Sequence, residues 1–280
     1  MAISLDKVEE QAPELVELYK KTKISLDKVE LRDHVARVAL VLDISLSMSE
    51  LYRHGKVNEL VKKAMALGLQ FDDNGGIDVF AFGVKAYEMG EYDMSNYKEC
   101  VNDTLQAHPL EGGTRYAEAL ELLAKNYADS DLPVYVMFVT DGDTEAKDKV
   151  TSQLIKMSKM PVFLQFMGVG EEILPEAPVA GPAPVGKSAA KKQGFFSKLL
   201  GLVVEQDTSA SPAKSPRKAV SSGFKYLMEL DEMEGRVVDN ANFFAIKDPA
   251  LIEDEALYGL LMNEYPGWLP QAKALRILRK

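Results

Sequence analysis

Two apolar runs that each end in aspartate constrain this chain more than any other feature of its sequence. Residues 35–43 read VARVALVLD, and residues 133–141 read PVYVMFVTD. A nearly continuous apolar run of this length is typical of a central parallel strand, which is buried on both faces. In open α/β sheets, ligands bind outside the carboxyl ends of such strands. The sequence therefore predicts that Asp43 and Asp141 lie at one ligand-binding edge of a parallel sheet.

Strand-like and helix-like segments alternate through the rest of this region. Apolar residues recur with a helical period in residues 55–71, 114–128 and 144–158. Further strands are indicated in residues 77–83, 161–170 and 236–246, and residues 85–90 could pair with 77–83 as an antiparallel neighbour. Strand–helix–strand order with short connections favours the α/β class. We expect a doubly wound, mostly parallel six-stranded sheet with helices on both faces.

The N-terminal part, residues 1–30, is a charged segment that we interpret as a helical arm. The heptapeptide ISLDKVE occurs in it twice, at 3–9 and at 24–30. Two copies are too few for a solenoid. A serine shortly before an aspartate is a common helix start, so we interpret both copies as helix starts.

A segment of different composition, residues 171–222, interrupts the pattern. It is rich in Pro, Ala, Ser and Lys, and it carries seven basic and two acidic residues between Gly181 and Ser222. Such a composition cannot bury a core, so we predict a disordered, basic linker. Helical patterns return at 224–233 and at 253–275, where Pro266 is expected to separate two helices. The linker would then interrupt one domain formed by residues 31–170 and 223–280.

Three short polar elements suggest a divalent-cation site at the predicted sheet edge. The first is Asp43-Ile-Ser45-Leu-Ser47, directly after a buried strand, and the second is Thr114, which follows two glycines at a helix start. The third is Asp141, at the end of the second buried strand. Hard cations such as Mg²⁺ bind oxygen ligands and retain several waters. We therefore predict that Asp43, Ser45, Ser47, Thr114 and Asp141 bind Mg²⁺, Mn²⁺ or Ca²⁺, directly or through water.

Each element has a more ordinary explanation when it is taken alone. The first is typical of a turn with a helix cap, the second of a tight turn, and the third of a loop before a helix. Their order along the chain, with two of them ending predicted parallel strands, favours the metal site.

These elements resemble the metal-ion-dependent adhesion site (MIDAS) of von Willebrand factor type A (vWA) domains. More narrowly, the phrases QFDDNGGIDVFAFG (70–83), GRVVDNANFFAI (235–246) and EYPGWL (264–269) resemble the TerF-type proteins of the bacterial tellurium-resistance group. The resemblance covers about residues 31–170 and 223–280. It implies a Rossmann-like vWA fold, a bound divalent cation, a cytoplasmic location and a role in chemical-stress defence through binding, not catalysis. One departure is Leu46, where many vWA domains have glycine.

Charge and composition exclude several other classes of function. The formal net charge is −10, so most of the surface would repel nucleic acid. The single cysteine, Cys100, permits no intramolecular disulfide, which fits a reducing compartment. Neither a signal peptide nor an apolar run long enough to span a membrane is evident. We expect a soluble cytoplasmic protein.

Two features of the linker attract alternative readings. Residues 181–188 match the P-loop expression, but Pro182 and Pro184 remove backbone donors that a phosphate would need. Residues 194–204 could form a short amphipathic helix with lysines nearby, which could dock weakly on a membrane or a partner or pack on its own domain.

The three histidines lack ligand spacing, so zinc is not expected.

Three hypotheses for function follow from these observations. The first is a cation-dependent binding module, in which a protein partner supplies an Asp or Glu to the metal. The second is a metal-dependent phosphohydrolase-like enzyme, for which the sequence shows no evident base or nucleophile and only Arg115 as a phosphate ligand. The third is a scaffold in which the metal is purely structural. We favour the first, a protein that is not an enzyme.

Overall fold

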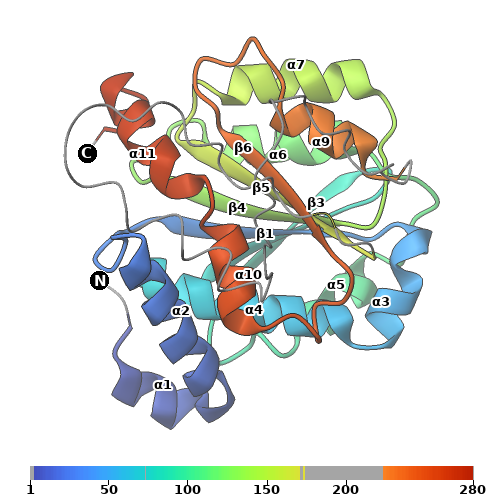
Figure 1. Cartoon of the computed structure of the whole chain (residues 1–280). Helices are drawn as coiled ribbons and strands as arrows, with labels where there is room; N and C mark the ends of the chain where they lie inside the picture. Colours follow the sequence, from blue (N-terminus) through green and yellow to red (C-terminus); the bar gives the residue numbers. More distant parts are fainter. Residues whose placement is uncertain (1–2, 73, 171–172, 174–222, 280) are drawn as a thin grey trace, which may run out of the picture.

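The computed structural model describes residues 3–72, 74–170, 173 and 223–279, which fold around one six-stranded sheet (Figure 1). The strands lie in the order β3-β2-β1-β4-β5-β6, and every neighbouring pair except β2–β3 is parallel. The strands are β1 Arg37–Asp43, β2 Ile77–Phe82, β3 Ala86–Tyr92, β4 Val134–Thr140, β5 Val162–Val169 and β6 Ala241–Ile246. The predicted fold class, including the antiparallel neighbour at one edge, is confirmed.

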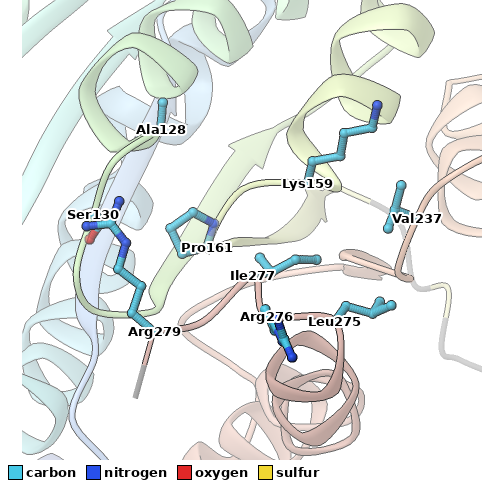
Figure 2. A pocket seen from close by; sticks show the side chains of 9 residues that line it. All are labelled: Ala128, Ser130, Lys159, Pro161, Val237, Leu275, Arg276, Ile277 and Arg279. Atoms are coloured by element: carbon cyan, nitrogen blue, oxygen red, sulfur yellow. The ribbon is translucent and has the colours of Figure 1, made fainter.

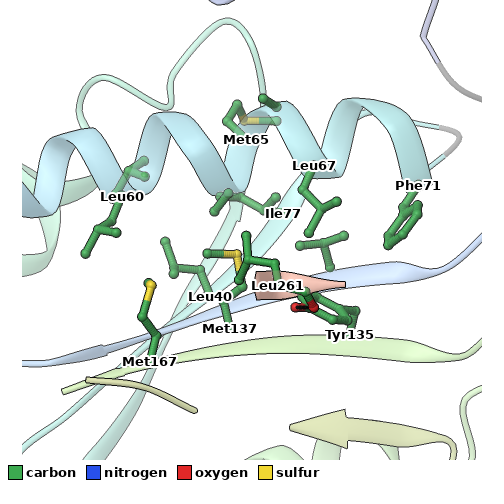
Figure 3. Close-up of a cluster of buried hydrophobic side chains, with 14 of the residues drawn as sticks. Leu40, Leu60, Met65, Leu67, Phe71, Ile77, Tyr135, Met137, Met167 and Leu261 are labelled. Carbon is green, nitrogen blue, oxygen red and sulfur yellow. Dashed lines mark hydrogen bonds between the residues drawn. The ribbon is translucent and has the colours of Figure 1, made fainter. Parts of the chain in front are cut away.

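Helices cover both faces of the sheet. On one face lie α1 Leu5–Gln11, α2 Val16–Lys28, α4 Lys56–Phe71, α5 Cys100–Ala107, α10 Asp254–Leu261 and α11 Tyr265–Ala274, and on the other lie α6 Tyr116–Tyr127, α7 Lys147–Met157 and α9 Lys225–Asp231. A short helix, α3 Ser49–Arg53, follows β1 through the 3₁₀ turn Leu46–Met48. In β1, Leu40 faces the first layer and Val41 the second. This two-sided burial explains why the strand is apolar without alternation. Figure 3 shows α4 packed on the sheet through Leu60, Leu67 and Phe71.

The N-terminal segment packs into the same core as the sheet. Helix α2 lies against α4 and α10, and Val8, Leu15 and Leu26 are buried in the first layer. The helix-start interpretation holds for the first ISLDKVE copy, where Ser4 accepts a hydrogen bond from the Lys7 N–H at 3.4 Å. It is wrong for the second copy, because that copy begins within the last turns of α2.

Two predicted boundaries need correction in the C-terminal part. The last strand is Ala241–Ile246, not 236–246, because Arg236 turns away and donates to the carbonyls of Met233 and Asp231. The two closing helices separate at residues 262–264 and not at Pro266. This proline lies in the first turn of α11, where a missing N–H removes no helical hydrogen bond.

The predicted linker, its P-loop match and the 194–204 segment lie outside the described residues, apart from Ile173. That residue pairs with Ala245 of β6 in both directions, at 3.0 and 2.8 Å. After the insert, Phe224 packs against Phe243 of the same strand. The described chain on each side of the insert therefore joins the same sheet, while the domain boundaries themselves stay predictions.

Candidate metal centre

Asp43, the last residue of β1, is fully buried at the carboxyl edge of the sheet. One carboxylate oxygen, Oδ1, accepts the Ser45 N–H at 2.7 Å, and the other, Oδ2, accepts the Thr140 hydroxyl at 2.6 Å. Burial raises the pKa of this carboxyl to about 6, against the lowering effect of these hydrogen bonds. The side chain is thus held in a fixed orientation by the loop that follows β1 and by the end of β4.

A line of side-chain oxygens runs from this loop to the end of β4. The hydroxyls of Ser45 and Ser47 are 2.9 Å apart, and Ser47 donates to Oδ1 of Asp141 at 2.8 Å. Asp141 is partly buried, and burial raises its pKa. The hydrogen bonds therefore bring together four of the five predicted ligands: Asp43, Ser45, Ser47 and Asp141.

Thr114, the fifth predicted ligand, lies on the adjoining loop. Its carbonyl accepts from the Glu145 N–H and from the Thr144 hydroxyl, each at 3.0 Å. These bonds tie its loop to the one that follows Asp141. Within the described ranges, the Thr114 hydroxyl itself makes no hydrogen bond to the other four side chains. The structure thus places this residue in the adjoining loop without joining its side chain to the network.

Glu111, which the sequence analysis missed, connects the loop of residues 44–47, here called the serine loop, to the β2–β3 hairpin. Its backbone N–H donates to Ile44 at 2.7 Å, and its carbonyl accepts from Leu46 at 2.8 Å. Its carboxylate accepts the Tyr87 hydroxyl at 2.5 Å and the N–H groups of Val84 and Lys85. Burial tends to raise the pKa of Glu111, but these hydrogen bonds prevail and lower it. The charged carboxylate therefore helps to hold the loop that carries Ser45.

Gly83 makes the close approach of Glu111 to the hairpin possible. A Cβ at this position would lie 2.6 Å from the Glu111 carboxylate and 2.7 Å from its Cβ. The carbonyl of Gly83 also accepts from the Arg115 N–H at 2.8 Å. The hairpin, the serine loop and the loop before α6 are thus locked together around one glycine.

Two buried tyrosines donate hydrogen bonds to the ends of β1 and β4 and to the loop after β4. The Tyr52 hydroxyl donates to the Asp43 carbonyl at 2.8 Å. The Tyr116 hydroxyl contacts the Gly142 carbonyl and lies 3.1 Å from the Thr140 hydroxyl. Thr140 is therefore held between an aromatic hydroxyl and the Asp43 carboxylate.

The donor set fits a hard divalent cation. Within the described chain, neither Asp43 nor Asp141 has a Lys or Arg at ion-pair distance, because the cations of the neighbouring loops are already paired: Arg115 with Glu145 at 3.0 Å, and Lys147 with Asp143 at 2.6 Å. One buried and one partly buried carboxylate without a counter-charge, beside two hydroxyls, make an all-oxygen set of the kind that Mg²⁺ binds. The same residues contain no cluster of three or more His, Cys, Asp or Glu side chains suited to a metal. Any bound cation would therefore depend on hydroxyls and waters as well as carboxylates.

The approach to this edge is partly apolar. Leu46 is 58% exposed between the two candidate serine ligands.

No helix among the described residues has the length and apolar character needed to cross a membrane.

Several solved structures are similar to this chain at low identity. A zinc-occupied MIDAS form of proximal thread matrix protein 1 from the mussel byssus is 17% identical, with a TM-score of 0.41, over 49% of this chain and 39% of that protein. An aerotolerance-related membrane protein from Bacteroides fragilis is also 17% identical, with a TM-score of 0.48, over 83% of this chain and 98% of that one. Manganese-loaded Plasmodium vivax TRAP protein matches at 17% identity and a TM-score of 0.39, over 48% and 57% of the two chains.

Similarity in sequence identifies the family of this chain more narrowly than the similar structures do. Protein YcbR of Bacillus subtilis strain 168, described as uncharacterized, is 30% identical over 273 residues, which cover 95% of this chain and 90% of that protein. The family model for the vWA domain found in the TerF C terminus matches residues 35–174 and 219–278. This match spans the sheet, all five candidate ligands and the helices of both layers except α1 and α2. The chain therefore belongs to the vWA-TerF-like family.

Proposed function

We propose that this chain is a divalent-cation-dependent protein-binding module and not an enzyme. The observation that carries the proposal is the continuous hydrogen-bonded line from Asp43 through Ser45 and Ser47 to Asp141, across the carboxyl ends of β1 and β4. Mg²⁺ is the cation that we expect first, with Mn²⁺ and Ca²⁺ as the alternatives.

Asp43, Ser45, Ser47, Thr114 and Asp141 would hold the cation, some of them through water. A cation that is held by few charged ligands remains electrophilic, and it would accept a carboxylate oxygen from a partner protein. An Asp or Glu of the partner is therefore the group that we expect to complete the coordination. Leu46 would meet an apolar neighbour of that residue.

The cellular setting is part of the proposal. Resemblance to TerF-type proteins supports a bacterial stress-response or tellurium-resistance role in the cytoplasm. Growth of a deletion strain on tellurite, with complementation by wild type and by Asp43→Asn, tests this role. Complementation by the variant as good as that by wild type would separate the stress role from the metal site.

The direct experiment is calorimetric titration of Mg²⁺, Mn²⁺ and Ca²⁺ into wild type, Asp43→Asn and Asp143→Asn. Asp143 is the matched control, because it lies in the loop after β4 but pairs with Lys147 at 2.6 Å. We expect saturable binding that Asp43→Asn abolishes and Asp143→Asn retains. Equal binding by all three proteins would reject the assignment of the ligands.

Partner binding is tested by immobilising this chain and measuring how much partner protein it captures in Mg²⁺ and in EDTA. Capture that persists in EDTA would contradict cation dependence.

No feature of the site favours the phosphohydrolase alternative, since Arg115, its one candidate phosphate ligand, is engaged by Glu145 and Glu118. Turnover in a phosphoester screen, lost in Asp43→Asn, would reverse that judgement.

A further inference from the structure

A cavity of about 480 Å³ lies at the opposite edge of the sheet from the candidate metal centre (Figure 2). Ser130 and Pro161 place it beside the amino ends of β4 and β5, whereas Asp141 follows the carboxyl end of β4. A strand of this length separates the two sites by about 20 Å. A partner bound in the cavity would therefore leave the metal edge free.

The cavity combines cations with exposed apolar side chains, and none of the described residues that line it is acidic. Val237 and Leu275 line it and are 47% and 49% exposed, although large apolar side chains are rarely so exposed elsewhere in the described chain. In Figure 2, Pro161 and Ile277 lie in the middle of the group, while Lys159, Arg276 and Arg279 lie around it. An apolar centre with a polar rim is the arrangement of a protein interface.

Two of the three cations have no acidic partner in the part of the chain that the structure describes. Arg279 is paired with Asp131 at 2.9 Å. Lys159 and Arg276 have no carboxylate within ion-pair distance among those residues, although the chain as a whole carries a net charge of −10. Unpaired basic side chains beside apolar surface on an acidic protein are complementary to an acidic segment that also carries apolar side chains.

Arg276 occupies a backbone position that would suit glycine better. Its φ of 59° lies in the left-handed region, directly after the C-cap of α11. Glycine is the usual residue at such a helix end, because a Cβ is unfavourable there. Its backbone N–H donates to Lys273 at 3.0 Å, a bond that glycine would keep. Local folding therefore gains nothing from the arginine side chain.

A free inorganic anion is a poor candidate for the occupant. The C-terminal ends of α6, α7 and α11 reach the cavity at Ala128, Lys159 and Leu275. Helix C-termini carry partial negative charge, which offsets part of the positive potential of the side chains. A peptide can instead place its carboxylates at the rim and its apolar side chains on the centre.

We propose that this cavity is a second docking site, which binds an acidic and apolar segment of a partner protein. Carboxylates of that segment pair with Lys159 and Arg276, and its apolar side chains pack on Val237, Leu275 and Ile277. The site operates without the metal centre. The chain would thus join one partner at the cation edge to another at this edge.

The test uses the full chain in EDTA, so that failure of the proposed metal site does not affect it. The probe is the peptide Ac-EDLLDE-NH₂, followed by amide chemical shifts of the protein. Its controls are Ac-EDSSDE-NH₂, Ac-QNLLNQ-NH₂ and inorganic phosphate. We expect the first peptide to shift Val237 and residues 275–279, and each control to bind about tenfold more weakly or not at all.

Three variants sharpen the result. Lys159→Glu and Arg276→Gly should each weaken the peptide about tenfold, whereas Lys149→Glu, an exposed charge reversal on α7, should not. Arg276→Gly should melt at the same temperature as wild type or higher, which excludes unfolding as the cause. Shifts elsewhere, no shifts at millimolar peptide, or equal shifts with phosphate or Ac-EDSSDE-NH₂ would overturn the proposal. An oligomer that Lys159→Glu dissociates would assign the cavity to a second copy of this chain instead.

Discussion

The hydroxyl of Thr140 donates a 2.6 Å hydrogen bond to Oδ2 of Asp43, and this bond joins the ends of β4 and β1 inside the sheet. Both residues are fully buried. The bond fixes one oxygen of the Asp43 carboxylate, while the Ser45 N–H fixes the other. The orientation of the proposed cation ligand therefore depends on a residue of another strand.

Thr140→Val should lower both stability and cation affinity. Valine has nearly the same shape but leaves a buried carboxylate oxygen without its donor, at a cost of about 1–3 kcal/mol in the free energy of unfolding. Loss of such a supporting partner reduces metal affinity roughly 10–100-fold. Urea unfolding and Mg²⁺ calorimetry measure the two effects.

Thr104→Val is the control for that experiment. Thr104 is also fully buried, but its hydroxyl bonds to the Cys100 carbonyl within α5 at 2.7 Å. It should lose stability and keep the cation affinity of wild type. If both variants bound Mg²⁺ as wild type does, the support role of Thr140 would be excluded.

Glu111→Gln should weaken cation binding although Glu111 is not a proposed ligand. The carboxylate accepts from Tyr87, Val84 and Lys85, and a glutamine amide would turn an N–H₂ group toward some of these donors. The loop through Leu46 should loosen, with a loss of cation affinity of roughly 10-fold. Glu88→Gln, at an exposed position on the same hairpin, should match wild type in the same titration. An unchanged affinity in Glu111→Gln would show that the serine loop holds its shape without this carboxylate.

The strands that form the middle of the sheet could be predicted, because burial on both faces requires apolar side chains at every position. The start of β6 could not. Val237 and Val238 continue an apolar pattern, yet the hydrogen bonds of Arg236 to the carbonyls of Met233 and Asp231 turn the chain before the strand begins. Helix α5 was also missed: its buried residues Cys100, Val101 and Thr104 follow a helical spacing, but its span of 8 residues is too short for the pattern to stand out.

The candidate site shows the same division between local and distant signals. Asp43, Ser45 and Ser47 share one loop, so their spacing in the sequence is enough to predict that they act together. Asp141 could be predicted because ligands bind at the carboxyl ends of parallel strands. Glu111 has no such signal, because its contacts to Ile44, Leu46 and Tyr87 exist only after the hairpin and the serine loop meet. Thr140 lies at the end of an apolar run, and that pattern gives no reason to expect a bond to Asp43.

Stability should fall as the pH rises from about 5 to 8, and Glu264 should account for part of the fall. Burial raises the pKa of Glu264 to about 7, with a further rise from Asp239 and an opposing effect of Arg236. A carboxyl whose pKa is raised in the folded state binds its proton more tightly there than in the unfolded chain. Its contribution is therefore complete below the ordinary pKa near 4.5 and is lost as the pH passes about 7.

Glu264→Gln isolates this contribution. The variant stays neutral at every pH, so its loss of stability between pH 5 and 8 should be smaller than that of wild type by about 1–2 kcal/mol, after allowance for solvent screening. Urea unfolding at both pH values gives the comparison. Asp231 and Asp239, whose pKa values burial also raises, remain in both proteins and should leave a residual slope. Identical slopes in the two proteins would assign the pH dependence to other groups.

Asp254→Asn should destabilise the protein more than any surface ion-pair variant. Asp254 binds the ammonium group of Lys63, whose side chain is 5% exposed, at 2.9 Å, and that of Lys21 on α2 at 2.8 Å. Asparagine would leave a charged lysine buried without its partner, which costs about 3–5 kcal/mol. Glu255→Gln is the matched control, because its partner Lys28 is partly exposed and such surface pairs contribute about 0–1 kcal/mol. Chemical unfolding measures the free energy of unfolding of both variants. Similar small losses in Asp254→Asn and Glu255→Gln would mean that Lys63 finds water or another acceptor when Asp254 is neutral. A large loss confined to Asp254→Asn would instead show that its pairs with Lys21 on α2 and Lys63 on α4 stabilise the packing of α10 against both helices.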